Sequence, residues 1–192
     1  MIDWVPGSSA DLAEVELEIA RQTAEVEEIL GRLSSGALNW RPSPAKWSVG
    51  GHVAHMAIVN GPYIETIGGC LAKARQRGRL GEGPYRHPWF GRWFAGAMAP
   101  PPKRRWKTAP KMVPDPEVEG ADVMQAFRDC QEELGRLAGE ARGVDLGRAR
   151  LSSPFMKILR FSVGATFGII LSHNRRHLWL IEEVMSDKAF PS

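Results

Sequence analysis

The sequence predicts an all-α protein, a four-helix bundle with one long crossover loop rich in proline and aromatic residues. Four stretches carry apolar residues at steps of three and four, the period of an α-helix with one buried face. Between the second and third of them, residues 78–116 break this pattern with closely spaced prolines and glycines. No stretch alternates convincingly between apolar and polar residues, as a half-exposed strand would. Amphipathic helices that bury their apolar faces against one another form a bundle.

Composition places the chain among soluble globular proteins. Its 192 residues are enough for one domain, residues 1–192, with a core of its own. A net charge of +3 is too small to imply a nucleic-acid partner. Cys70 and Cys130 form neither a CxxC motif nor a disulfide framework, which fits a reducing cytoplasm. The N-terminus lacks signal-peptide features, and the longest apolar run is too short to cross a bilayer. We therefore expect a cytoplasmic protein without membrane or nucleic-acid partners.

The first helix is predicted to begin at residues 8–11, which give a capping-box-like start. Its glutamates, Glu18 among them, are assigned mostly to the outer face, and residues 34–36 are predicted to end it. Two prolines exclude a helix in the link over residues 38–44. The buried face of this helix is predicted to comprise Leu12, Val15, Ile19, Gln22, Val26, Ile29 and Leu33.

The second helix is predicted over about residues 49–76, with Ser48 as its N-cap. Pro62 should bend or interrupt it. Gly50 and Gly51 weaken its first turn, and we interpret them as positions of close packing rather than as room above a binding site.

The third helix is predicted over about residues 121–142, and the fourth from after Ser162 to about Ser186. The connector between them, around residues 151–155, is predicted to be extended. The inner stripe of the third helix comprises Val123, Phe127, Cys130, Leu134 and Leu137. The apolar face of the fourth helix comprises Val163, Phe167, Ile170, Asn174, His177, Ile181 and Val184.

Four of the five histidines fall in two short helical segments. His173 and His177 are four residues apart, which places them on neighbouring turns with Cβ atoms roughly 5–6 Å apart. His55 lies two turns inside the second helix. Three imidazoles from two helices around one core make an open three-nitrogen site, the form of a catalytic metal centre that keeps a position for water. Histidines bonded to backbone or water are the alternative, and the accumulation of four favours a metal site.

Three motifs of the chain resemble those of the DinB-like (DinB/YfiT) superfamily of metal-dependent hydrolases and thiol S-transferases. The first comprises LNWRP at 38–42 and KWSV at 46–49, the second is His55-Met56, and the third is HNRRHL at 173–178. Each motif alone is weak, whereas their combination and order are fairly specific and span the chain from end to end.

The resemblance implies an up-down-down-up four-helix bundle, often dimeric, with a divalent metal ion such as zinc or nickel. Carried over residue by residue, the implied metal ligands are His55, His173 and His177. The chain departs from the family pattern at the third residue of the second helix, which is usually polar and is Gly51 here.

Members of this superfamily include thiol-dependent enzymes, such as bacillithiol S-transferases and a mycothiol-dependent isomerase. The resemblance therefore implies a thiol S-transferase or hydrolase acting on a small-molecule substrate through a metal-activated thiol or water. A low-molecular-weight thiol would be a second cofactor. The alternative is a non-catalytic, stress-related or small-molecule-binding bundle with a residual or structural metal site. An open coordination position favours the enzyme, and four closed protein ligands favour the structural role.

Further residues flank the histidines. His52 is open to three interpretations: support for a ligand, an extra ligand, or a plain core residue, which we favour. Arg175 and Arg176 are candidate anion clamps for a carboxylate or thiol cofactor, although we favour a solvated face for both. Trp179, opposite His177 on its helix, is predicted to pack on the aromatic loop or on another subunit, and together with the resemblance it indicates a homodimer.

The crossover loop is predicted to pack on the bundle, with a short helix around residues 90–98. A structureless loop of this length is uncommon and often functional. We predict that residues 83–106 lie over or beside the metal end and help to form the substrate pocket. The alternative is that these rings plug the opposite end of the core. The basic cluster at 103–107 is interpreted as solvated loop rather than as a site for single-stranded nucleic acid. The aromatic residues of the loop are Trp89, Phe90, Trp93, Phe94 and Trp106.

Overall fold

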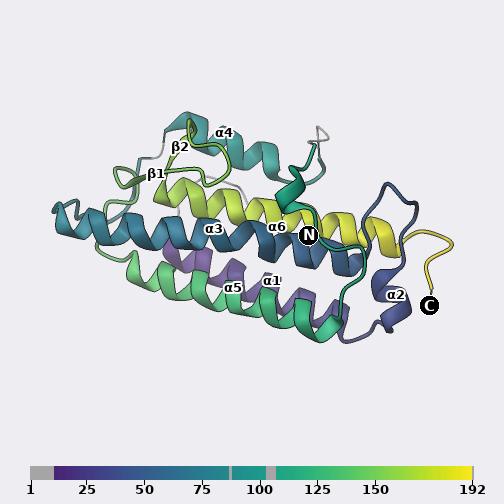
Figure 1. The fold of residues 1–192 in the computed structure, drawn as a ribbon. Coiled ribbons are helices and arrows are strands. Elements are labelled where there is room, and N and C mark those ends of the chain that lie inside the picture. Colours follow the sequence, from purple (N-terminus) through teal and green to yellow (C-terminus); the bar gives the residue numbers. More distant parts are fainter. Residues whose placement is uncertain (1–10, 87, 103–106, 192) are drawn as a thin grey trace.

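The computed structural model describes residues 11–86, 88–102 and 107–191, and these are mostly helical (Figure 1). The predicted all-α class is confirmed, with one short two-stranded sheet in addition. A 3₁₀-helix, η1, covers Pro110–Met112, and β1 (Arg150–Ser152) pairs antiparallel with β2 (Arg160–Ser162). The α-helices of the described residues are α1 (Leu12–Leu30), α2 (Ser35–Asn39), α3 (Val49–Gln76), α4 (Trp89–Met98), α5 (Gly120–Glu140) and α6 (Val163–Met185).

The four longest helices, α1, α3, α5 and α6, lie lengthwise against one another (Figure 1). Glu27 of α1 pairs with Arg128 of α5, and Glu16 pairs with Arg142 just after α5, so these two helices are antiparallel. Figure 1 shows α1 and α6 running in one direction and α3 and α5 in the other. None of the described helices combines the length and apolarity needed to cross a membrane.

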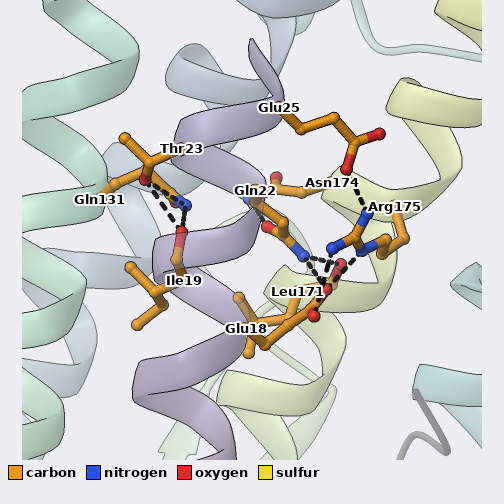
Figure 2. A network of polar contacts seen from close by, with 9 residues as sticks. All are labelled: Glu18, Ile19, Gln22, Thr23, Glu25, Gln131, Leu171, Asn174 and Arg175. Atoms are coloured by element: carbon orange, nitrogen blue, oxygen red, sulfur yellow. Dashed lines mark hydrogen bonds and ion pairs between the residues drawn. The ribbon is translucent and has the colours of Figure 1, made fainter. Parts of the chain in front are cut away.

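A layer of buried polar side chains, called the polar level below, separates two apolar clusters in the core between these helices. In α1, Gln22 lies between Ile19 of one cluster and Val26 of the other. Gln131 of α5 and Asn174 of α6 likewise lie between a residue of one cluster and a residue of the other (Figure 2). Asn174 Nδ2 donates to Gln22 Oε1 (3.0 Å), and Gln131 Nε2 donates to the Ile19 carbonyl (3.2 Å). This level favours one alignment of the helices, because a shift would leave buried polar atoms without partners.

The buried helix faces agree closely with the prediction, whereas one face assignment and one segment excluded from helix differ. All residues predicted for the apolar face of the fourth helix are buried. The assignment of Glu18 to the outer face is wrong, because the residue is 2% exposed. The prediction that no helix forms over residues 38–44 is wrong for residues 38 and 39. The short helix α2, capped by Ser34, extends to Asn39. A proline constrains only the residue directly before it, so Pro42 does not reach back to Leu38.

Two further expectations concern Pro62 and the connector after α5. Helix α3 runs continuously through Pro62, so the expected interruption is wrong, and the bend that was its alternative stays a prediction. The missing N–H leaves the carbonyl of Ile58 without its helical donor, and Ile58 is exposed, so water can satisfy it. The extended connector is confirmed in part, since residues 150–152 form β1. Strands of three residues are too short to show an alternating pattern in the sequence.

Helix α4 confirms the short helix predicted around residues 90–98, and it packs on α6 and on β2. Phe90 stacks on Phe161 at 5.9 Å between ring centroids, and Phe94 contacts the same ring at 5.2 Å. Trp89 and Trp93 are 71% and 56% exposed, so only two of these four rings pack inward. Trp106 and most of the basic cluster lie outside the described residues, as does the start expected at residues 8–10.

Gly91 sets how closely α4 approaches α6. A Cβ atom at Gly91 would lie 2.7 Å from the Cβ of Ala165, whereas one at Gly96 would meet nothing within 4 Å. Gly91→Ala is therefore expected to destabilise the protein by about 1–3 kcal/mol through overpacking. Gly96→Ala, in the same helix, is expected to stabilise it by about 0.5–1 kcal/mol. Urea unfolding of both variants checks this, and equal effects of the two substitutions would contradict close packing at Gly91.

Candidate metal centre

Ser48 and Ser162 fix the starts of the two helices that carry the histidines. Each hydroxyl accepts a hydrogen bond from the backbone N–H three residues ahead, at 3.1 Å and 3.3 Å. These N-caps place His55 two turns inside α3, and His173 and His177 in the middle of α6. Because α3 and α6 pack lengthwise, the two helices bring these histidines face to face.

The structure groups the three histidines that the sequence singled out. One ring nitrogen from each of His55, His173 and His177 lies within 4.8 Å of the other two. The ring centroids are 4.5 to 5.2 Å apart. His55 and His177 are buried, and His173 is half-buried. In the described part of the chain, no cysteine, aspartate or glutamate joins this group.

The ring of His55 is oriented by the backbone of η1. Its Nδ1 lies 2.6 Å from the carbonyl oxygen of Met112. A carbonyl only accepts hydrogen bonds, so Nδ1 carries the proton and Nε2 keeps its lone pair. Burial lowers the pKa of His55, and the Met112 carbonyl opposes this shift. A neutral imidazole with one nitrogen held by a carbonyl is the usual state of a metal ligand.

His52 contacts His177, the contact that its interpretation as support for a ligand requires, and its role stays a prediction. The two Nδ1 atoms are 2.9 Å apart, so one nitrogen donates and the other accepts. Burial, followed by the nearby charge of His55, lowers the pKa of His52 to about 3. Burial also places the pKa of His177 well below its usual value. Both rings are therefore neutral near pH 7. When His177 is the donor, its Nε2 keeps a free lone pair.

His173 carries the atom that most clearly calls for a partner. Its Nδ1 is buried and forms no hydrogen bond in the structure. Burial lowers the pKa of His173 to about 3, and the charges of His55 and Arg176 add to this shift. Leaving a buried polar atom unpaired costs free energy that a metal ion would recover. Three neutral imidazoles with one such nitrogen fit a zinc-like divalent ion, for which imidazole is a common ligand.

The indole ring of Trp47 covers the cluster. Its centroid lies 4.7 Å from the ring of His55, 5.5 Å from His52 and 6.0 Å from His177. Trp47 directly precedes the N-cap of α3, so the helix start fixes its position. Sequence reasoning did not assign Trp47 to the site, although the residue belongs to the first motif.

The crossover loop contacts the histidine site through residues 112–114. These residues follow the segment, 83–106, that was expected to cover the site. The carbonyl of Met112 contacts His55, and Pro114 lies beside Gly51. Gly91 faces Ala165, which precedes His173 by about 12 Å along α6 at 1.5 Å per residue. Whether the rings of residues 83–106 line the substrate pocket therefore stays a prediction. A backbone carbonyl gives no signal in a sequence, so the contact of Met112 was not foreseeable.

The interpretation of Arg175 and Arg176 as a solvated face is wrong. Arg175 forms ion pairs with Glu18 and Glu25 of α1 (Figure 2). Arg176 is 9% exposed, and its charge lowers the pKa of His173. Arg175 is thus committed to α1, whereas Arg176 lies within electrostatic reach of the histidines.

The two cysteines pack on the apolar cluster and do not belong to the histidine group. Cys130 Sγ donates to the carbonyl of Ala57 at 3.7 Å. Burial, with a contribution from Asp129, raises the pKa of Cys130 to about 11. Burial also raises the pKa of Cys70. Both side chains are therefore neutral thiols near pH 7, which makes them poor nucleophiles.

A comparison with protein families adds to this geometry. The family model described as the DinB superfamily matches residues 18–181, which include the three grouped histidines, His52, all of α3 and α6 as far as Ile181. No curated protein and no solved structure matches the chain. The match covers well over half of the sequence, and the chain therefore belongs to the DinB superfamily.

Proposed function

We propose that His55, His173 and His177 hold one divalent ion, zinc or nickel, in an up-down-down-up four-helix bundle. We further propose that the protein is a metal-dependent enzyme of the thiol S-transferase or hydrolase type. The observation that carries this is the group of three neutral imidazoles whose ligand atoms lie within 4.8 Å of one another. When bound, a divalent ion lowers the pKa of a water or thiol and so supplies a nucleophile near neutral pH.

The residues around the histidines have distinct parts in this proposal. The Met112 carbonyl holds the proton of His55 on Nδ1, and His52 does the same for His177 by accepting its Nδ1–H. Trp47 keeps water away from one side of the cluster. We assign to the guanidinium of Arg176 the binding of an anionic group of the substrate or of a low-molecular-weight thiol.

The composition of the group supports a catalytic site over a structural one. Among the described residues it contains three histidines and no carboxylate or thiolate. Structural zinc sites are closed by four protein ligands, whereas catalytic sites keep a position for water or substrate. A three-histidine set is of the second kind.

The proposed activity can be tested with untagged protein that carries one equivalent of zinc or nickel. A panel of small thiols with electrophilic acceptors, together with hydrolysable esters and amides, would be screened against wild type and His177→Ala. We expect turnover that the variant lacks, and we expect Arg176→Lys to raise KM more than it lowers kcat. Stoichiometric metal binding without turnover on any substrate would favour the non-catalytic bundle instead.

His52→Ala is expected to retain one bound ion but to weaken its affinity by about 10–100-fold, as loss of a ligand's supporting partner usually does. The physical reason is that His177 loses the acceptor that holds its proton on Nδ1. Competition with a chromophoric chelator measures the affinity. Unchanged affinity would return His52 to the role of a core residue, and complete loss of metal would make it a ligand.

We also propose that the chain forms a homodimer. Trp179 is half-buried, and Trp89 and Trp93 are exposed one turn apart on α4. Exposed apolar patches of this kind often mark contacts between chains. Sedimentation velocity at micromolar concentration is expected to show a dimer that Trp179→Ala or Trp89→Ala weakens. A wild-type monomer under these conditions would contradict the proposal.

A further inference from the structure

A second candidate site lies at the other end of α3 from the histidines. A hollow of about 660 Å³ opens between the residues that end α3 and the segment from Asp145 to β2. His55 and Arg77 are separated by about 33 Å along the helix at 1.5 Å per residue. The hollow is therefore independent of the proposed metal centre. Its charged lining comprises Arg77, Arg79, Asp145, Arg148, Arg150 and Arg160.

Backbone hydrogen bonds hold the two sides of the hollow together. Leu80 and Val144 form an antiparallel bridge, and the N–H of Asp145 donates to the carbonyl of Arg79 at 3.0 Å. A guanidinium nitrogen of Arg79 donates to the carbonyl of Arg148 at 3.4 Å. These bonds bring arginines from distant parts of the sequence to one surface. No run of basic residues in the sequence therefore predicts this cluster of arginines.

The sheet fixes the direction of two of the arginines. Arg150 and Arg160 lie in β1 and β2, where neighbouring residues point to opposite faces. Leu151 and Phe161, which are paired in the register, are buried in the core. Arg150 and Arg160 therefore project from the outer face of the sheet toward solvent, and both line the hollow.

The positive charge of the hollow is not balanced within the described residues. Asp145 is the single carboxylate of the lining, and its Oδ1 accepts from the N–H groups of Gly147 and Arg148, both at 3.1 Å. None of the five arginines forms an ion pair with a described carboxylate. Arginines elsewhere in the described chain contrast with this, since pairs with glutamate are formed by Arg32, Arg128, Arg136, Arg142 and Arg175. Five guanidinium groups around one hollow repel one another unless an anion lies between them.

We propose that this hollow binds a small ligand with at least two phosphate groups. Guanidinium groups match phosphate oxygens in pairs of parallel hydrogen bonds, and several of them are needed to neutralise a multiply charged anion. The volume falls in the range of small-molecule sites. None of the described residues of the lining carries an aromatic ring, whereas single-stranded nucleic acids are commonly bound by base stacking on such rings.

Calorimetric titration of the full chain without added metal tests the proposal, with inorganic phosphate, pyrophosphate and tripolyphosphate as probes. We expect one saturable site per chain, with affinity rising from phosphate to tripolyphosphate. The double variant Arg150→Gln and Arg160→Gln should weaken tripolyphosphate binding by about tenfold or more, since each lost charge-assisted hydrogen bond contributes that order. Arg77→Gln should weaken it in the same direction and leaves the sheet untouched.

A matched control removes the same charge elsewhere, at Arg32 and Arg128, by substitution with glutamine. This variant should bind tripolyphosphate within about twofold of wild type once salt has screened distant charges. Equal losses of tripolyphosphate affinity in both double variants would mean that the effect depends only on net charge, and would overturn the proposed site. Absence of saturable binding at millimolar probe would overturn it as well. Tighter binding of a single-stranded oligonucleotide, displaced by tripolyphosphate, would replace the small ligand by a nucleic acid.

Discussion

Alanine substitution of His55, His173 or His177 is expected to abolish stoichiometric metal binding, with affinity falling by three orders of magnitude or more. Each variant removes one of three nitrogens from the group, and a two-histidine site loses the greater part of the binding free energy, which is about 10–16 kcal/mol for structural zinc sites. Metal content of untagged protein purified without chelators measures the loss. The His52→Ala variant serves as control, because it removes a buried imidazole next to the same cluster without removing a proposed ligand.

Full metal content in any one of the three variants would exclude that residue from the site. Folding has to be checked in parallel, because these side chains fill space between α3 and α6. Circular dichroism and the urea midpoint of the metal-free variants give this check. A variant that is folded and metal-free supports the assignment.

Arg175→Ala is expected to destabilise the metal-free protein by about 2–4 kcal/mol. Glu18 is 2% exposed, and Arg175 provides its ion-pair partner, with Nη2 donating to Oε2 at 3.2 Å (Figure 2). Truncation of the arginine leaves the buried carboxylate with one other donor, Gln22 Nε2, at 2.7 Å. The arginine itself is partly exposed, so the loss should fall short of the largest values for buried pairs. Urea unfolding measures the change.

Arg136→Ala supplies the matched control for the buried pair. Arg136 forms ion pairs with Glu133 and Glu140 on the surface of α5, and its side chain is 51% exposed. Exposed pairs contribute about 0–1 kcal/mol, so this variant should unfold close to wild type. Similar losses in Arg136→Ala and Arg175→Ala would show that burial of Glu18 does not matter. Double replacement of Glu18 and Arg175 by leucine should recover part of the stability, since no charge then stays buried.

The histidine faces could be predicted from the sequence because they depend on helical period alone. Once α3 and α6 are helices with buried stripes, the spacing of His173 and His177 fixes their common face. The position of His55 follows from the N-cap at Ser48. The remaining step, that α3 and α6 are neighbours, came from the resemblance of the motifs rather than from periodicity.

Features that depend on contacts between elements could not be predicted. Glu18 lies at the border of the apolar stripe of α1, and only the approach of α6 decides that its carboxylate is buried with Arg175. The contact of His52 with His177 depends on ring rotation across two helices. The arginine-lined hollow assembles residues from the end of α3 and from both strands, so its charge is visible only in the folded chain.

X-ray absorption spectroscopy of the zinc- or nickel-loaded protein tests the central claim most directly, because it counts the atoms bound to the ion. Three imidazole nitrogens at about 2.0–2.1 Å, accompanied by an oxygen from water, are expected for a zinc ion held by His55, His173 and His177. Loss of one imidazole contribution in a variant that retains some metal would identify each ligand in turn. A sulfur ligand at about 2.3 Å, or four imidazole nitrogens with no exchangeable oxygen, would contradict the open three-histidine site.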